Sequence, residues 1–168
     1  SSDGGSTFFA MDRRVDTDAP GAADSTRCDL AVQGASVYLA WEDERFGLSD
    51  VLLNVSADGG ATWKASESQV NTSPPGATRA ILPQVALGDG VVFVTWADDR
   101  QGAFDVLLAT SDDDGTTWRD PPFRMNTSAL GTSNALAPDI VVSGGRARVV
   151  WYDDRFGPGD IFFNRAGP

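Results

Sequence analysis

A ten-residue polar pattern occurs three times and carries residue types that bind charged or polar groups. It reads Trp-x-Asp-x-Arg-x-Gly-x-x-Asp, and its members after the tryptophan are Asp43, Arg45, Gly47 and Asp50, then Asp98, Arg100, Gly102 and Asp105, then Asp153, Arg155, Gly157 and Asp160. Residues two apart share one face of a strand, and a turn can return the last aspartate beside the arginine. The pattern therefore predicts a bidentate arginine–carboxylate clamp across each loop.

These clamps have two interpretations. Because the pattern recurs in all three places, a structural role is favoured. In the other interpretation the clamps form a polar ligand site, with candidate residues Asp43, Arg45, Asp98, Arg100, Tyr152, Asp153 and Arg155. Positions that differ between copies would then tune the site: Glu42, Ala97 and Tyr152, and Glu44, Asp99 and Asp154.

Several kinds of site are excluded or disfavoured. The chain has no histidine, which excludes a histidine-ligated zinc, a Ser-His-Asp triad and a Cys-His dyad. The single cysteine, Cys28, cannot form an internal disulfide and is expected to be a small buried residue. Asp112, Asp113 and Asp114 suggest calcium, but a solvated turn is favoured because Asp113 already has a role in that turn. No metal site and no cofactor are predicted.

The elements that position the polar pattern belong to a tandem repeat. Trp41, Trp96 and Trp151 are 55 residues apart, and the units 1–55, 56–110 and 111–165 align without a gap. Each unit opens with Ser-x-Asp-x-Gly-x-Thr followed by an aromatic residue. The members are Ser1, Asp3, Gly5, Thr7 and Phe8, then Ser56, Asp58, Gly60, Thr62 and Trp63, then Ser111, Asp113, Gly115, Thr117 and Trp118. Such a segment predicts a hairpin turn in which the aspartate accepts backbone N–H groups and glycine supplies the positive φ.

This opening pattern resembles the Asp-box, or bacterial neuraminidase repeat, of sialidases and other secreted proteins. The resemblance implies an all-β fold of β-propeller blades with four antiparallel strands each, three blades in this chain, and an extracellular or secreted location. It also implies a carbohydrate or protein ligand on the face opposite the Asp-boxes. The motif itself is a structural turn, so it indicates fold more than activity.

The remainder of each unit predicts the blade strands. First strands are expected at 28–33, 83–88 and 138–143, second strands at 37–41, 92–96 and 147–151, and third strands at 50–55, 105–110 and 160–165. A fourth, outermost strand follows each Asp-box, for example at 63–71. Most second strands are apolar at successive positions, as expected where both faces are covered.

The phase of the repeat predicts a partner. Residues 7–17 form a fourth strand without a blade, whereas 138–165 form a three-stranded blade without a fourth strand. Propellers have four to eight blades, and the resemblance implies six. We therefore expect a homodimer in which 7–17 of each copy completes 138–165 of the other, closing a six-bladed ring. The alternative is a fragment of a longer single-chain propeller.

The formal net charge of −11 argues against nucleic acid or an anionic membrane as partner. No apolar run is long enough to span a bilayer, and the N-terminus has no signal-peptide pattern. Asn-Thr-Ser at 71–73 and 126–128 fits the glycosylation sequon.

Catalysis of the sialidase kind is not predicted. The resemblance would require an arginine triad that includes an Arg-Ile-Pro motif, together with a tyrosine–glutamate pair, and the sequence has no Arg-Ile-Pro. The only tyrosines are Tyr38, expected in a strand or blade interface, and Tyr152, which has no glutamate close in sequence. A non-catalytic, self-assembling module is therefore expected, and a fragment of a sialidase-like glycoside hydrolase is the alternative.

Overall fold

The computed structural model describes residues 6–7 and 9–166, and the described residues form strands, turns and loops only. The first sheet comprises β1 (Ser25–Gln33), β2 (Ser36–Asp43), β3 (Asp50–Ser56) and β4 (Ser68–Gln69) in sequence order. The second comprises β5 (Ala80–Gly88), β6 (Val91–Asp98), β7 (Asp105–Ser111) and β8 (Phe123–Arg124). The third has β9 (Ala135–Ser143), β10 (Arg146–Asp153) and β11 (Asp160–Ala166).

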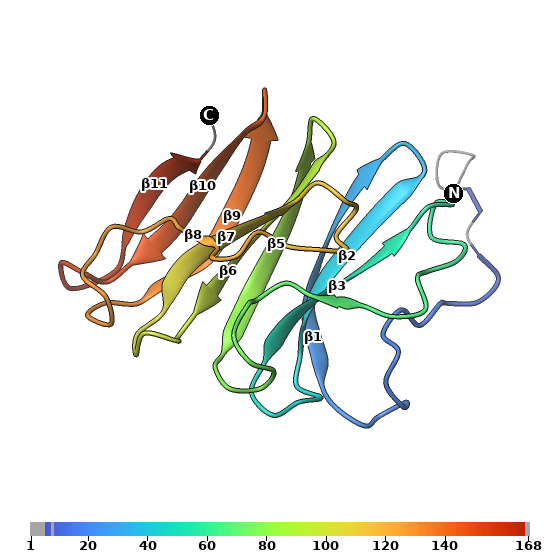
Figure 1. Ribbon diagram of the computed structural model, residues 1–168, viewed down its shortest axis with the longest axis horizontal. Helices are drawn as coiled ribbons and strands as arrows, with labels where there is room; N and C mark the ends of the chain where they lie inside the picture. Colours follow the sequence, from blue (N-terminus) through green and yellow to red (C-terminus); the bar gives the residue numbers. More distant parts are fainter. Residues whose placement is uncertain (1–5, 8, 167–168) are drawn as a thin grey trace.

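The three antiparallel sheets stand side by side like the blades of a fan, which confirms the predicted all-β blade architecture (Figure 1). We call them blade 1, blade 2 and blade 3. The first strands lie against one another, β1 against β5 and β5 against β9, whereas β4 and β8 lie at the rim. The first strands are therefore the inner edge of the blades, as they are in a propeller.

Two hydrophobic cores hold the blades together, one at each contact between neighbouring sheets. The first joins Ala40, Val51 and Leu53 of blade 1 to Val94 and Trp96 of blade 2. The second joins blade 2 to blade 3 and contains Val106, Leu108, Ile140, Val149 and Trp151. The middle strands of blade 2, β6 and β7, are therefore apolar on both faces, the pattern that the sequence predicted for covered strands.

Two expected strands differ in the structure. The fourth strand predicted at 63–71 is reduced to Ser68–Gln69, because Asn71 and the residues after it turn back over the end of β3. The strand predicted at 7–17 is not a strand in the single chain, where the described residues of this segment form turns and loops. The partner edge proposed for it, β11 of another copy, is not part of one chain.

The turns that follow β3 and β7 have the hydrogen bonds predicted for them, and we call residues 56–63 and 111–118 the box turns. Asp58 Oδ1 accepts the backbone N–H of Thr62 at 2.8 Å and the Ser56 hydroxyl at 2.8 Å, and its Oδ2 accepts the Thr62 hydroxyl at 2.6 Å. Asp113 makes the same contacts with Ser111 and Thr117. Gly60 and Gly115 have positive φ, and Trp118 packs on the first core. Ser1, Asp3 and Gly5, predicted to form the first such turn, lie outside the described residues.

The box-turn carboxylates give a pH prediction. Hydrogen bonds from the Thr62 side chain and backbone lower the pKa of Asp58 from its ordinary 3.8 to about 2, and Thr117 does the same for Asp113. Because these pKa values are depressed in the folded state, the stabilisation is complete above the ordinary value and is lost as the pH falls through about 2. A ¹³C carboxyl titration by NMR should give both midpoints near 2. Thr62→Val should raise the midpoint of Asp58 alone; equal midpoints in the variant and the parent would contradict this origin.

Candidate functional site

The loops between second and third strands and those between successive blades gather at one end of the molecule, which we call the loop end. In Figure 1 this end is the lower edge, and the hairpins between first and second strands are at the upper edge. All candidate ligand residues of the Trp-x-Asp-x-Arg pattern lie at the loop end, where β2, β6 and β10 finish. The described residues provide no helix of the length and hydrophobicity needed to cross a membrane.

Each arginine of the pattern is clamped by the aspartate two residues before it. Arg45 donates from Nε to Asp43 Oδ1 and from Nη2 to Asp43 Oδ2, both at 2.7 Å. Arg100 binds Asp98 in the same bidentate way, at 2.7 and 2.6 Å, and Arg155 Nη2 lies 2.5 Å from Asp153 Oδ2. The three aspartates are completely buried. Burial raises the pKa of Asp43, but hydrogen bonds from Arg45 and Trp41 outweigh it, and the net pKa is lowered.

The predicted pairing of the last aspartate with the arginine is wrong. Asp50 lies opposite Asp43 in the β2–β3 register, but its Oδ1 accepts Asn71 Nδ2 at 2.8 Å and its Oδ2 accepts the backbone N–H of Gly76 at 2.8 Å. Burial raises the pKa of Asp50, and nearby Asp43 adds to the rise. The two facing carboxylates thus have separate partners. Asp43 binds Arg45, and Asp50 binds amide groups of the loop that follows β4.

Asp105 repeats this arrangement with Asn126, which donates to it at 2.7 Å. Asn71 and Asn126 are each 2% exposed. Their amides are engaged inside the loops, so the folded structure does not present these two sequons for glycosylation.

In two of the clamps a further guanidinium nitrogen reaches the preceding blade. Arg100 Nη1 reaches the hydroxyl of Thr72 at 3.3 Å, and Arg155 Nη1 reaches that of Thr127 at 3.4 Å. At the equivalent place in blade 1, Glu67 lies between Arg45 and Thr17: it accepts Arg45 Nη2 at 3.3 Å and the Thr17 hydroxyl at 2.6 Å. Burial raises the pKa of Glu67, but hydrogen bonds from Thr17 and the charge of Arg45 outweigh it. The clamps therefore hold the loops and blades together.

A second group of polar residues lies at the inner edge, where β1 and β5 begin. We call Arg27, Asp29 and Glu42, with the backbone N–H groups of Leu82 and Val85, the inner-edge cluster. Glu42 is 4% exposed and accepts Arg27 Nη1 at 3.3 Å on both oxygens, and its Oε1 accepts Leu82 N at 2.7 Å. Asp29 Oδ2 accepts Val85 N at 2.8 Å.

A backbone irregularity marks the same place in every blade. Arg27, Leu82 and Ala137 occupy the same repeat position and have φ of 49°, 57° and 51°, and the register with the second strand shifts around each of them. Positive φ is costly for residues other than glycine, and bulges of this kind re-aim side chains near functional sites. At this bulge the Arg27 side chain is 58% exposed while it binds Glu42 of β2.

The exposed guanidinium of Arg27 is the group in this cluster best able to meet a ligand. Both of its hydrogen bonds come from Nη1, so Nε and Nη2 have no hydrogen-bond partner among residues 6–7 and 9–166. A fork of free N–H donors recognises carboxylates and sugar hydroxyls. Arg27 is not among the candidate residues predicted from the sequence. The sequence signal for it is that this repeat position differs between copies (Arg27, Leu82 and Ala137), as does the position of Glu42, Ala97 and Tyr152.

Tyr38 and Tyr152 lie on the corresponding side of blade 1 and of blade 3. Tyr152 is 38% exposed on blade 3, where no blade of this chain covers it. Tyr38, expected in a strand or blade interface, is 5% exposed and donates its hydroxyl to Asp114 Oδ1 of blade 2 at 2.6 Å. Burial, followed by this contact with Asp114, raises the pKa of Tyr38 to about 12.

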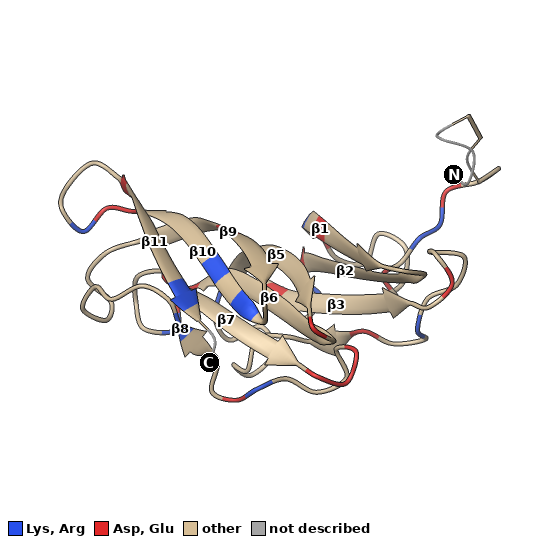
Figure 2. Ribbon diagram, turned by 90° about the horizontal axis from the view of Figure 1, so that it is seen from above, with Lys and Arg blue, Asp and Glu red and all other residues tan. Residues whose placement is uncertain are grey.

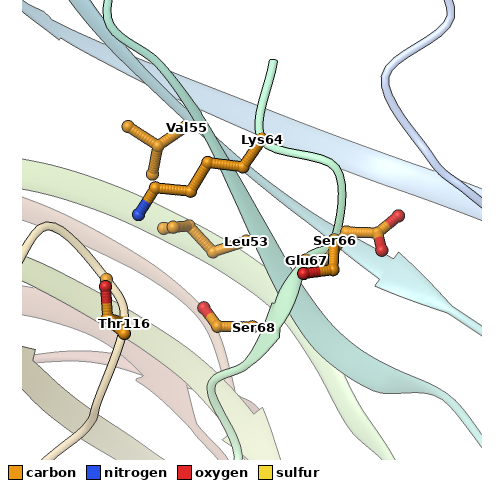
Figure 3. Close-up of a pocket in the computed structure, with 8 residues that line it drawn as sticks. Leu53, Val55, Lys64, Ser66, Glu67, Ser68 and Thr116 are labelled. Atoms are coloured by element: carbon orange, nitrogen blue, oxygen red, sulfur yellow. The ribbon is translucent and has the colours of Figure 1, made fainter.

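A hollow of about 300 Å³ lies at the rim between blade 1 and the second box turn (Figure 3). Leu53, Lys64 and Ser68 line one side, and Thr116 faces them across the hollow. Its one cation, Lys64, donates to the carbonyl of Asp114 at 3.0 Å. The hollow is a gap between two blades, far from the inner edge. Among the described residues no group of three or more Cys, Asp or Glu side chains is arranged to hold a metal ion.

Comparison with known proteins shows the fold. No protein-family model matches the chain, and no curated protein matches its sequence. Among solved structures, the α-L-arabinofuranosidase of glycoside hydrolase family 93 from Fusarium graminearum, solved with arabinobiose, has a TM-score of 0.64 and 18% identity. It aligns with 90% of this chain and 48% of its own.

Two further solved structures extend the comparison. Zg3597, a family 117 glycoside hydrolase from the marine bacterium Zobellia galactanivorans, has a TM-score of 0.60 and 12% identity over 92% of this chain and 56% of its own. The Penicillium chrysogenum α-L-arabinanase, solved with arabinobiose, has a TM-score of 0.56 and 17% identity over 78% of this chain and 41% of its own. The chain thus has a β-propeller fold like that of glycoside hydrolases and spans about half the length of these structures.

Proposed function

We propose that the chain forms three blades of a carbohydrate-active propeller of the glycoside-hydrolase kind, and that its own role is to bind sugar at the inner edge of the loop end. The observation that carries this proposal is the free guanidinium fork of Arg27, anchored on buried Glu42 at a left-handed bulge. The similarity to glycoside hydrolases supports carbohydrate as the ligand class. The Asp-box resemblance, with the secreted location that it implies, is consistent with this role.

Binding without cleavage is the expected behaviour of these three blades. Cleavage of a glycosidic bond by the usual route needs two carboxyl groups available to the substrate. Asp29 and Glu42 are the carboxylates of the inner-edge cluster, and each accepts a backbone N–H of blade 2. The clamp aspartates Asp43, Asp98 and Asp153 are buried and paired with arginine.

Sugar binding is tested by titrating the ¹⁵N-labelled chain with arabinobiose and with N-acetylneuraminic acid, a neutral and an acidic probe. At least one sugar should shift the amide signals of residues 27, 29, 42 and 82. Arg27→Gln should weaken binding by about tenfold, the loss expected for a hydrogen bond to a charged donor. Arg119→Gln is the matched control, because Arg119 lies beyond the second box turn, where it stacks on Phe123.

Two results would contradict the proposal: neither sugar shifts the inner-edge signals, or Arg27→Gln binds as tightly as the parent chain. Release of nitrophenol from nitrophenyl arabinofuranoside and sialoside, measured on the same sample, separates binding from cleavage. Sugar binding with no release supports a binding module, and release above that of the free substrate would favour the glycoside-hydrolase reading.

A further inference from the structure

Every blade has two faces, which pack on different neighbouring blades. We call the face toward the preceding blade the rear face and the face toward the following blade the forward face. Within the chain the forward face of blade 1 packs on the rear face of blade 2, and blade 2 packs on blade 3 in the same way. Among residues 6–7 and 9–166, no sheet packs on the rear face of blade 1 or on the forward face of blade 3.

The rear face of blade 1 is apolar where its counterparts are buried. Leu30 is 59% exposed, whereas Val85 and Ile140, at the same repeat position, are 6% and 8% exposed. Val32 is 57% exposed, whereas its counterpart Leu87 packs against the first core. Beside them lies a hollow of about 380 Å³ lined in part by Leu39 and Trp41. The rear face of blade 1 therefore has the apolar residues of a contact between blades, but these residues are exposed.

The forward face of blade 3 shows the same contrast. Ile161 is 79% exposed, whereas Val51 and Val106, at its repeat position, are completely buried. Phe163 is 60% exposed, whereas its counterparts Leu53 and Leu108 are 1% and 0% exposed. Val141 and Val150 extend this apolar surface at 61% and 40% exposure. A surface of this kind on one side of a sheet marks an interaction site.

The N-terminal segment already lies where the fourth strand of a preceding blade belongs. Asn54 of blade 1 donates to the carbonyl of Val15 at 3.4 Å, and Asn164 of blade 3 donates to that of Met125, which follows the fourth strand of blade 2, at 2.8 Å. Asn54 and Asn164 share one repeat position, as do Val15 and Met125. The segment around Val15 therefore covers blade 1 as Met125 covers blade 3.

The internal strand pairs fix the register that a second copy would use. Leu52 and Leu53 pair with Gln69 and Ser68, and Leu107 and Leu108 pair with Arg124 and Phe123. The same spacing pairs Phe162 and Phe163 of β11 with Arg14 and Arg13 of another copy. The edge of β11, which has no partner strand among the described residues, would gain a fourth strand.

Charge on the two end faces is also complementary. Arg146, Arg148 and Arg165 are the basic residues in the strands of blade 3, visible as blue segments of β10 and β11 in Figure 2. At the first blade contact, Tyr38 binds Asp114 in the box turn of blade 2. Arg148 occupies the repeat position of Tyr38. In the matching box turn of another copy, Gly59 takes the place of Asp114, and the neighbouring Asp58 has a depressed pKa that keeps it ionised. An arginine would thus face an acidic turn.

We propose that a second copy of this chain docks on these faces, the rear face of blade 1 against the forward face of blade 3, at two identical seams. Two-fold symmetry then closes six blades into a ring and leaves no exposed blade face. The occupant is another copy because the two faces match each other as the internal contacts do. This assembly does not depend on sugar binding.

Sedimentation velocity on the purified chain tests the ring. The expected species has twice the 17.8 kDa mass of one chain. Leu30→Asp and Ile161→Asp each introduce a charge into the seams, and each should convert the dimer to the single chain. The strand signal in circular dichroism should stay unchanged, because both side chains are exposed in the single chain. Arg148→Glu should weaken association at least tenfold. Leu130→Asp is the matched control, since Leu130 is 57% exposed in a loop away from both end faces.

A parent chain that sediments as a single chain at 100 µM would overturn the proposal and favour further blades from a longer protein as the occupant. A dimer that survives both seam variants would also overturn it, because association would then use another surface. Open-ended, concentration-dependent polymers would contradict closure.

Discussion

Asp98→Ala is expected to lower the free energy of unfolding by about 3–5 kcal/mol, the range found when one partner of a buried ion pair is removed. Asp98 is completely buried and accepts four hydrogen bonds, from Trp96 Nε1, the backbone N–H of Arg100, and Arg100 Nε and Nη2. The variant leaves the Arg100 charge and the indole N–H without their acceptor in the middle blade. Urea unfolding followed by tryptophan fluorescence at one fixed protein concentration measures the loss.

Asp99→Ala is the control for this variant. Asp99 follows directly in sequence, but it accepts one backbone N–H, from Arg79 at 2.8 Å. Its replacement should cost about 0.5–1.5 kcal/mol, the net contribution of a single hydrogen bond. Equal losses in the two variants would show that the clamp does not hold the blade.

Gly76→Ala is expected to destabilise the chain by about 1–3 kcal/mol more than Gly21→Ala, a range typical of overpacking. Both glycines have positive φ, +66° at Gly76 and +74° at Gly21, so alanine would be in a strained backbone conformation at either position. The surroundings differ. A Cβ on Gly76 would lie 2.0 Å from the carbonyl oxygen of Phe46, whereas one on Gly21 meets nothing within 4 Å.

The additional cost at Gly76 comes from separating two loops at the loop end. The backbone N–H of Gly76 donates to Asp50, and its carbonyl accepts Leu48 N at 3.3 Å. Thermal unfolding of the two variants under identical conditions gives the comparison. If Gly76→Ala and Gly21→Ala had the same midpoint temperature of unfolding, the close approach of these two loops would be refuted.

The blades could be predicted from the sequence because the repeat constrains three copies at once. Trp41, Trp96 and Trp151 fix the phase, and each is at most 4% exposed; Trp96 and Trp151 lie in the two contacts between blades. The box turns follow from local chemistry, since Ser56, Asp58 and Thr62 complete their hydrogen bonds within seven residues. Short-range interactions of this kind are encoded in adjacent residues and need no knowledge of the tertiary fold.

The clamp partner could not be predicted in this way. Asp43 and Asp50 are both close to Arg45 in sequence, and spacing alone does not separate them. The choice depends on Asn71 and Gly76, which come from beyond the fourth strand and take Asp50. The short fourth strand has the same origin, because the chain leaves the sheet after Gln69 to make these contacts.

The inner-edge cluster could not be predicted from the sequence, because it is formed by contacts between blades. Glu42 and Leu82 are 40 residues apart, and Asp29 and Val85 are 56 apart, yet each pair forms a hydrogen bond. Such residues are difficult to predict from a repeat, because the repeat pattern is defined by the positions that are the same in every copy. Positions 27 and 42 of the unit, where the copies disagree, are where the structure places Arg27 and Glu42.

A disulfide across the proposed seam tests the ring most directly. At the contact between blades 2 and 3, a Cβ on Gly88 would lie 3.3 Å from the Cβ of Val142. The same positions at the seam are Ser143 of one copy and Val32 of the other, and a disulfide needs about 3.5–4.5 Å between Cβ atoms. Cys28 is exposed, so the prediction that it is buried is wrong, and Cys28→Ser is needed to remove this free cysteine. In that background, Val32→Cys combined with Ser143→Cys should oxidise to a covalent dimer on a non-reducing gel.

Gln33→Cys combined with Ser143→Cys is the matched control, because residue 33 points to the opposite face of the strand from residue 32. The ring predicts rapid, near-complete crosslinking of the Val32 pair and little crosslinking of the Gln33 pair. A chain that stays uncrosslinked in both variants, or that crosslinks equally in both, would contradict it.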